Sequence, residues 1–434
     1  MMRRYTYIAA TLMAAAFGPL GSRSVAAQAS ARQASATQAP RPASHPAVDS
    51  ASAARTAARE ASRSSSGAER VQIMQRATQA WPTQPAYWQM LERAALAAGD
   101  SAHAQRARQR LEALDVGTAR VQPDSVQIRF SMPDSLEFME GIVWDAQQGV
   151  LLLTEMRRGT VWRMTREGRS HDLRLDTLPG MSAVWAARGA HDGQSLWVSS
   201  AAMPTHTRAR GASVSAAAIW QIESSRGAVI NRWALPDSLA EHAPGDLLVL
   251  RDGRVLVSDA ATAAVYVLHP GTGRIETIRH PLLRSPQGVV ELPADAAKPA
   301  HSVVLLADYS HGLLRIDLAA GEVYRVEDAA DRSVLGLDGM AWHKGRLVAV
   351  QNGLTTPRVL VIALDGDARR VLDAVTLWRD TSLLRSPTTL TSDGESLWLF
   401  ANTQWEDYAP DGSRVKGRPL HAAQVVRLSG FSRR

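Results

Sequence analysis

A module of roughly 40–50 residues recurs six times between Glu140 and Leu428, and no other feature of the chain restricts its fold so strongly. Each copy opens with a polar residue and a short apolar strand, as in EGIVW at Glu140 and DGMAW at Asp338. A second strand then ends in an acid, an amide or Ser, and a third follows a loop. Such repeats are typical of a β-propeller. We therefore predict a mainly β fold, a six-bladed β-propeller over residues 118–434.

The sixth copy ends after its third strand, Gln424–Leu428, which leaves that blade one strand short. An alternating segment ahead of the first copy, Ser125–Phe130, predicts the missing strand. Pairing these two segments would join the ends of the ring and remove the exposed edges of an open sheet. The alternative is an edge strand that pairs elsewhere.

The N-terminal region has the features of an export signal. Arg3 and Arg4 precede an apolar stretch, Ile8–Leu20, that is too short to span a bilayer comfortably, and small residues follow it. We predict a signal peptide over residues 1–29, cleaved after Ala27 or Ala29. The mature protein would then be periplasmic or secreted, with no transmembrane anchor. Residues 30–67, rich in Ala, Ser, Pro and Gln, predict a disordered linker.

Residues 68–117 place apolar side chains at helical spacing, with breaks at Trp81-Pro82 and Gly99-Asp100. Small Ala residues at close-packed positions make this stretch resemble a tetratricopeptide (TPR) helical pair. Its length is about one and a half repeats, fewer than the three or so that a free solenoid needs. We predict a small TPR-like helical segment that either packs on the propeller as an accessory or binds a protein partner.

Composition excludes several classes of function. Most of the formal net charge of +7 comes from Arg residues in the first 67 positions, so the remainder of the chain is nearly neutral. A neutral body lacks the positive surface that nucleic acid binding requires, and we expect no nucleic acid partner. The chain has no Cys, which excludes disulfides and thiolate metal sites.

Antiparallel order places the start of each first strand and the end of each second strand on one face of the ring. The starts are Glu140, Met181, Asp246, Gln287, Asp338 and Thr388. The ends are Glu155, Ser200, Asp259, Asp308, Asn352 and Asn402. Two long insertions, Ala201–Ala217 and Thr403–His421, rise from the same face in the blades that flank blade one. We expect both to overhang Glu140, because loops of this length are often lids or binding loops.

The segments around Glu140 and Asp338 resemble the "EGPVW" and "PDGM" segments of the SMP-30/gluconolactonase/LRE family, over roughly residues 125–430. Members of that family are six-bladed propellers that bind one divalent metal in the central channel. The resemblance implies that Glu140, Gln287 and Asp338 bind the metal and that Asp246 contacts the substrate. Gln287 stands where the family has Asn, and Pro244 stands where it has a substrate-contacting Arg.

Two carboxylates and an amide oxygen form an oxygen-only set, which suits Ca²⁺ or another hard divalent cation. A bound cation would polarise a lactone carbonyl, and Asp338 would act as the catalytic base that takes a proton from water. The resemblance thus implies a metal-dependent hydrolase of a lactone or related ester. The alternative is a non-catalytic propeller that binds a ligand or a protein, in which Glu140 and Asp338 only hydrogen-bond to neighbouring strand ends.

Overall fold

The computed structural model of the protein describes residues 46–64, 66–115, 121–133, 136–203, 217–236, 240–293, 302–328, 334–353, 356–409 and 413–433. Within these ranges the chain forms two compact units, one that ends at Leu111 and one that begins at Glu112. The segment predicted to be a signal peptide lies outside the described residues. No helix in the described ranges is long and apolar enough to cross a membrane.

The first unit is helical, as the periodicity of residues 68–117 predicts. Its helices are α2 (Pro46–Arg63), α3 (Gly67–Ala80), α4 (Pro85–Ala97) and α5 (Ser101–Ala113). Ser66 caps α3, because its hydroxyl accepts the backbone N–H of Glu69 at 3.3 Å. Asp100 does the same before α5, where its carboxylate accepts the N–H of His103 at 3.1 Å.

Helix α2 lies inside the segment predicted to be a disordered linker, residues 30–67, so that prediction is wrong for residues 46–63. Ala54, Ala57, Ala58 and Ala61 are buried along one face of the helix, which packs against α3. Each Ala buries little area, but it loses no side-chain entropy in a helix and lets two helices approach closely. Low hydrophobicity alone therefore underestimated this segment. Residues 30–45 lie outside the described ranges.

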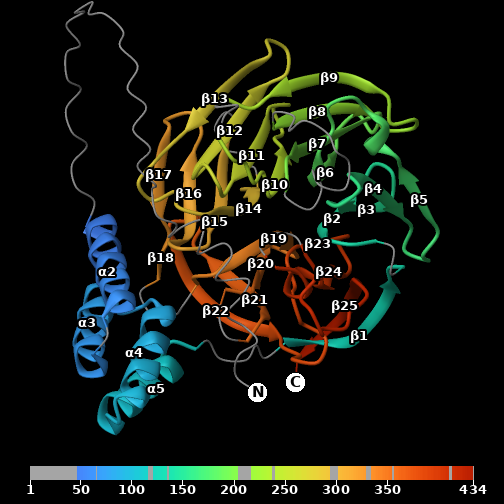
Figure 1. Ribbon diagram of the computed structural model, residues 1–434. Coiled ribbons are helices and arrows are strands. Elements are labelled where there is room, and N and C mark those ends of the chain that lie inside the picture. The colour runs from blue at the N-terminus through green and yellow to red at the C-terminus, as the bar shows by residue number, and fades with distance from the viewer. Residues whose placement is uncertain are drawn as a thin grey trace, which may run out of the picture. The chain divides into compact units, whose positions relative to one another are not determined.

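The second unit is the predicted six-bladed propeller (Figure 1). Blade one contains β2 (Met139–Asp145), β3 (Val150–Glu155), β4 (Thr160–Met164) and β5 (Ser170–Leu173). Blade two contains β6 (Ala183–Gly189), β7 (Ser195–Ala201), β8 (Ala218–Glu223) and β9 (Val229–Ala234). Blade three contains β10 (Asp246–Val249), β11 (Val255–Asp259), β12 (Ala264–His269) and β13 (Arg274–Ile278).

Blade four contains β14 (Pro286–Glu291), β15 (Val303–Asp308), β16 (Gly312–Asp317) and β17 (Glu322–Arg325). Blade five contains β19 (Leu337–His343), β20 (Arg346–Gln351), β21 (Arg358–Leu364) and β22 (Arg370–Trp378), with the short β18 (Glu327–Asp328) parallel to β22. Blade six contains β23 (Leu390–Ser392), β24 (Leu397–Asn402), β25 (Gln424–Arg433) and β1 (Val121–Ser131). The strands nearest the common axis are β2, β6, β10, β14, β19 and β23 (Figure 1).

The ring closes as predicted. Strand β1 pairs antiparallel with β25, and Val126 lies opposite Leu428. The apolar core lies between adjacent blades, which explains why the second strands are apolar on both faces. In β15, for example, all six side chains of VVLLAD are buried. A sheet covered on both faces favours continuous Val and Leu rather than alternation.

Candidate functional site

The polar residues at three strand starts occupy equivalent positions. Glu140, Gln287 and Asp338 are each the second residue of their strand, in β2, β14 and β19, and each precedes a glycine. Pairing with the next strand shifts register there in all three blades, between Met139 and Ile142, Pro286 and Val289, and Leu337 and Met340. Such irregularities re-aim side chains, and here they recur at the residues that the sequence predicts to share a site.

The glycines in these strand starts allow neighbouring blades to approach closely. A Cβ atom at Gly288 would lie 2.4 Å from the backbone oxygen of Asp338. One at Gly339 would lie 2.5 Å from the Cα of Thr389. Any side chain at either position would push two blades apart. At each of these strand starts, the glycine lets neighbouring blades pack closely, and the polar residue before it carries the candidate functional side chain.

Glu140 is buried, and its carboxylate interacts with a residue from the blade-six insertion. The indole N–H of Trp405 donates to Oε2 of Glu140 at 2.5 Å. Burial and, to a smaller extent, the negative charge of Asp338 raise the pKa of Glu140 to about 8, even though the hydrogen bond from Trp405 lowers it. The carboxyl group of Asp338 is therefore close enough for its charge to make ionisation of Glu140 less favourable.

Asp338 is also buried and is held by Asn352. The side-chain amide of Asn352 donates to Oδ2 of Asp338 at 2.6 Å and to the backbone oxygen of Pro387 at 2.7 Å. Burial is the main reason that the pKa of Asp338 is raised to about 7; the hydrogen bond from Asn352 opposes this rise, and the charge of Asp246 adds to it. Among the described residues, neither Asp338 nor Glu140 forms an ion pair with Lys, Arg or His.

No hydrogen-bond donor among the described residues contacts the side-chain amide oxygen of Gln287. Its side-chain amide nitrogen donates to the hydroxyl of Ser285 at 3.0 Å, which fixes the orientation of the amide. Its Oε1 atom points toward Gly245, 3.8 Å from where a Cβ of that glycine would lie. An oxygen presented in this way could serve as a neutral ligand even though Gln stands where the resemblance implies Asn.

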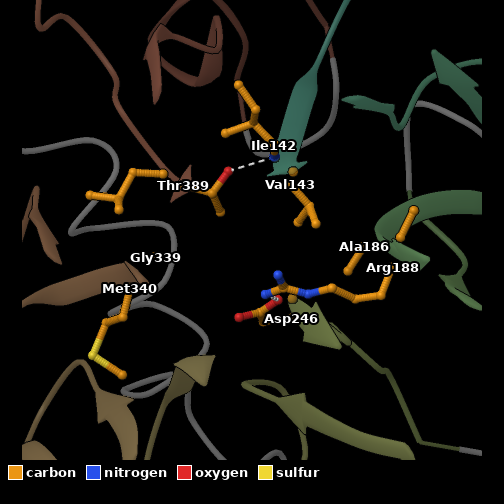
Figure 2. A pocket seen from close by; sticks show the side chains of 12 residues that line it. Ile142, Val143, Ala186, Arg188, Asp246, Gly339, Met340 and Thr389 are labelled. Carbon is orange, nitrogen blue, oxygen red and sulfur yellow. Dashed lines mark hydrogen bonds and ion pairs between the residues drawn. The ribbon is translucent and has the colours of Figure 1, made fainter. Parts of the chain in front are cut away.

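Asp246, the residue that the resemblance implies to contact substrate, is engaged by protein groups in this structure. Its Oδ2 accepts the backbone N–H of Val289 at 2.9 Å, and its Oδ1 accepts the N–H of Leu247 at 2.8 Å. Oδ1 also lies 3.3 Å from the guanidinium of Arg188 (Figure 2). Both oxygens are thus engaged within the protein. Asp246 thus connects blade three to blade four and contacts Arg188; its contact with a substrate stays a prediction.

Two buried oxygens near Asp338 have no hydrogen-bond partner in the described part of the chain, Oδ1 of Asn352 and the hydroxyl of Tyr309. Burial and the charge of Asp338 raise the pKa of Tyr309, so its hydroxyl stays protonated. Its ring lies against Gly353, where a Cβ would come within 2.7 Å of Cζ. Unpartnered buried polar atoms are rare and destabilising. These two oxygens are therefore in an unfavourable environment unless a further group binds to them.

The donor set fits a hard cation. Within the described ranges, no group of three His, Cys, Asp or Glu side chains could hold a metal, so a cation here would need neutral oxygens beside its two carboxylates. Gln287 and Asn352 both present amide oxygens, and Glu140 and Asp338 supply the charge. Such oxygen-only sets suit Ca²⁺ or Mg²⁺ rather than softer metals.

The insertion Thr403–His421 reaches Glu140, as predicted; we call it the strap. It contains the short 3₁₀ helix η2 (Trp405–Asp407). The N–H of Phe138 donates to Oε1 of Gln404 at 3.1 Å, and the rings of Phe138 and Trp405 meet edge to face at 5.4 Å. Phe138 and Gln404 both have positive φ, 60° and 72°. Strained backbone of this kind clusters at functional sites.

The blade-two insertion, Ala201–Ala217, falls mostly outside the described residues. Its first part is described, and Met203 packs in one apolar cluster with Phe138 and Tyr408 of the strap. That cluster covers the blade-one side of the channel mouth, next to Glu140.

Sequence reasoning did not identify Trp405 or Arg188. The contact of Trp405 depends on the path of the strap, which no local pattern encodes. Arg188 could have been noticed in the sequence, because it is a charged residue in the otherwise mostly apolar strand AVWAARG. A charged side chain in a buried strand usually has a partner or a function. The sequence places Asn352 on the same face of the ring as Asp338, but the hydrogen bond between the two could be found only in the structure.

No family model and no curated protein matches this chain. Virginiamycin B lyase from Staphylococcus aureus is similar in structure, with a TM-score of 0.47 and 13% identity over 70% of this chain and 99% of the lyase. A luciferin-regenerating enzyme is similar at a TM-score of 0.47 and 14% identity, over 71% and 95%. A nidogen/laminin complex is similar at 0.41 and 12%, over 56% and 82%. These likenesses concern the six-bladed fold.

Proposed function

We propose that the mouth of the channel binds one hard divalent cation, with Ca²⁺ the expected ion, and hydrolyses a lactone or related ester. Glu140, Gln287 and Asp338 would hold the cation. One observation carries this proposal: the carboxyl groups of Glu140 and Asp338 are buried, the charge of Asp338 acts on Glu140, and no cationic side chain of the described residues pairs with either. Buried carboxylates need a counter-charge or a proton.

A cation would relieve two unfavourable features of the site together. It would offset the repulsion between Glu140 and Asp338, and it would give the oxygens of Gln287 and Asn352 a partner. Because a cation binds the ionised carboxylates, it would also release the protons that burial favours. The site would then change from a partly protonated pair to a charged and satisfied one.

When bound, the cation would supply Lewis acidity to an ester carbonyl. The protein groups would do the rest. Asp338, fixed by its bond from Asn352, would take the proton from an attacking water. Trp405 would hold Glu140 in place, and the strap would keep bulk water from the blade-one side of the mouth.

A non-catalytic ligand-binding propeller is the second candidate, and one specific observation favours it. Both oxygens of Asp246 already accept protein N–H groups, which removes one of the polar groups that would orient a substrate. In this reading the cation site would shape a binding surface rather than activate a substrate.

The test is a panel of lactones and carboxylic esters assayed with the wild type, with and without a chelator. Asp338→Asn keeps one oxygen ligand but loses the base, so turnover should fall by roughly two to four orders of magnitude. Glu322→Gln, an exposed change on the outer strand β17, is the matched control and should leave turnover unchanged. Absence of turnover across the panel, in protein shown to hold calcium, would favour the binding module.

We also propose that the protein is exported, to the periplasm or beyond, and that its helical unit offers a surface to a protein partner. The order of charged, apolar and small residues in the first 29 positions supports export. Protein purified from the native host should begin after Ala27 or Ala29. A mature chain that begins at Met1 would contradict this.

A further inference from the structure

Arg188 projects from β6, an innermost strand, into the channel, where two contacts fix its guanidinium group. Its Nε–H donates to the backbone oxygen of Leu247 at 2.7 Å, and one terminal nitrogen lies 3.3 Å from Oδ1 of Asp246. The side chain is 22% exposed, so it is held in place but not sealed off. Figure 2 shows the guanidinium beside Asp246, among residues that come from several blades.

The space around Arg188 is a narrow cavity, and its lining offers few polar side chains. Arg188 and Asp246 are the charged residues that line it; the others are small or apolar apart from Thr389. The oxygens of Asp246 are already engaged, as described above. The guanidinium has five N–H donors, and only two contacts to described residues use them. Arg188 itself lines the cavity, so the donors that these contacts leave over are available to a ligand there.

We propose that Arg188 binds a carboxylate group of the ligand in this cavity. A guanidinium that is already oriented by Leu247 and Asp246 presents its free N–H groups as a planar fork, and a carboxylate matches that fork with two parallel hydrogen bonds. A phosphate is a poorer fit, because no second cationic side chain lines the cavity to balance its charge. That this carboxylate belongs to the substrate rests on the proposed function. That Arg188 binds a carboxylate does not.

The cavity lies directly beside the strand starts that carry the candidate cation ligands. Gly141 and Gly339, which follow Glu140 and Asp338, both line it. Negative charge on Glu140 and Asp338 would repel an incoming carboxylate, and a divalent cation would remove that repulsion. Binding of the carboxylate and of the cation should therefore favour each other, and by linkage the effect should be reciprocal.

Formate is the simplest probe, because it carries the proposed group and nothing else. We would measure melting temperatures in sodium formate and in sodium chloride at equal ionic strength, with and without calcium. Formate well above its dissociation constant should raise the melting temperature of the wild type by about 2–4 °C relative to chloride. Calcium should lower the formate concentration that gives half of the rise.

The variants are Arg188→Gln, Arg188→Lys and the control Arg226→Gln, which changes a residue whose side chain is 78% exposed and which pairs with Glu223 at 2.8 Å. Arg188→Gln should lose the formate-specific rise, and Arg226→Gln should keep it. Arg188→Lys retains the charge without the fork and should need about tenfold more formate. If Arg188→Gln does not fold, Arg188→Lys still decides the question.

An equal formate response in the wild type and in both Arg188 variants would overturn the inference. So would an equal rise in chloride and formate, because the site would then not select a carboxylate. A calcium response without any formate response would reject this inference alone. A formate response that needs Arg188, without any calcium response, would reject the proposed cation site and leave the carboxylate site standing.

Discussion

The indole N–H of Trp405 and the carboxylate of Glu140 meet at 2.5 Å, although the two residues lie 265 positions apart in the chain. One belongs to the strap of blade six and the other to the first strand of blade one. The strap is therefore fastened directly to a residue that we propose as a cation ligand. A change in the charge of Glu140 should therefore change the strength of the hydrogen bond that holds the strap.

Replacing Trp405 by Phe removes this hydrogen bond and keeps a ring to pack on Phe138. Trp405→Phe should lower the free energy of unfolding by about 1.5–3 kcal/mol at pH 9, where Glu140 is mostly ionised, because hydrogen bonds to charged groups are the stronger class. Urea titration measures this. Trp342→Phe is the control, since its indole donates to the neutral backbone oxygen of Glu291 and should lose only about 0.5–1.5 kcal/mol.

The raised pKa values make stability depend on pH in a defined direction. Burial raises the pKa of Glu140 from its ordinary value of 4.5 to about 8 and that of Asp338 from 3.8 to about 7. Their contribution is present below pH 4 and is lost as pH rises through 7 to 8. Without divalent cations, the wild type should therefore lose a few kcal/mol of stability between pH 5 and pH 8.5, since one pKa unit corresponds to about 1.4 kcal/mol.

Glu140→Gln should flatten that pH dependence and should be more stable than the wild type at pH 8.5, because Gln is neutral and still accepts the bond from Trp405. Urea titrations at several pH values compare the two proteins. A wild-type stability that rises from pH 5 to pH 8.5, relative to Glu140→Gln, would contradict the predicted sign.

Calcium should reverse the loss at high pH. Saturating calcium should raise the melting temperature of the wild type at pH 8, and the rise should shrink at pH 5.5, where protons compete for the same carboxyl groups. Asp338→Ala should abolish the rise, whereas Glu322→Gln should retain it. Equal rises in all three proteins would show that calcium binds elsewhere.

The fold could be predicted from the sequence because the same strand pattern recurs along the chain. Six copies of one strand pattern specify both the blades and the missing strand, and the pairing of Val126 with Leu428 agrees with that count. Likewise, the heads Glu140, Gln287 and Asp338 align because equivalent positions in a propeller converge on one axis. In a propeller, residues at the same position in different repeats lie at equivalent positions around the axis.

What escaped sequence reasoning lies where the repeats differ. Trp405 belongs to an insertion present in one blade, so no sister position indicates where its side chain points. For Asp246 the head position was predicted, but the backbone N–H groups of Leu247 and Val289 that its oxygens accept were not. Helix α2 was missed because Ala-rich composition does not distinguish a linker from a close-packed helix. In each case the outcome depended on one local contact rather than on a pattern.

Deleting residues 121–131 should destabilise the whole propeller, because β25 would lose its outer neighbour and the ring its closure. Calorimetry should show a lower melting temperature for the propeller. Deleting residues 46–63 instead should affect only the helical unit, where α2 packs on α3. A propeller that melts unchanged without β1 would mean that the closing pair contributes little.

The pairing of β1 with β25 also sets how the chain reaches its native state. Val126 and Leu428 come from opposite ends of the propeller sequence, so this contact has the longest sequence separation of any strand pair in the ring. Contacts of high separation form late and slow folding, because a long loop must be ordered first. Until that moment an unclosed intermediate presents two free strand edges, one at each end of an incomplete circle, and both could pair with another chain. We expect the final step of folding to govern both the speed of folding and the risk of aggregation.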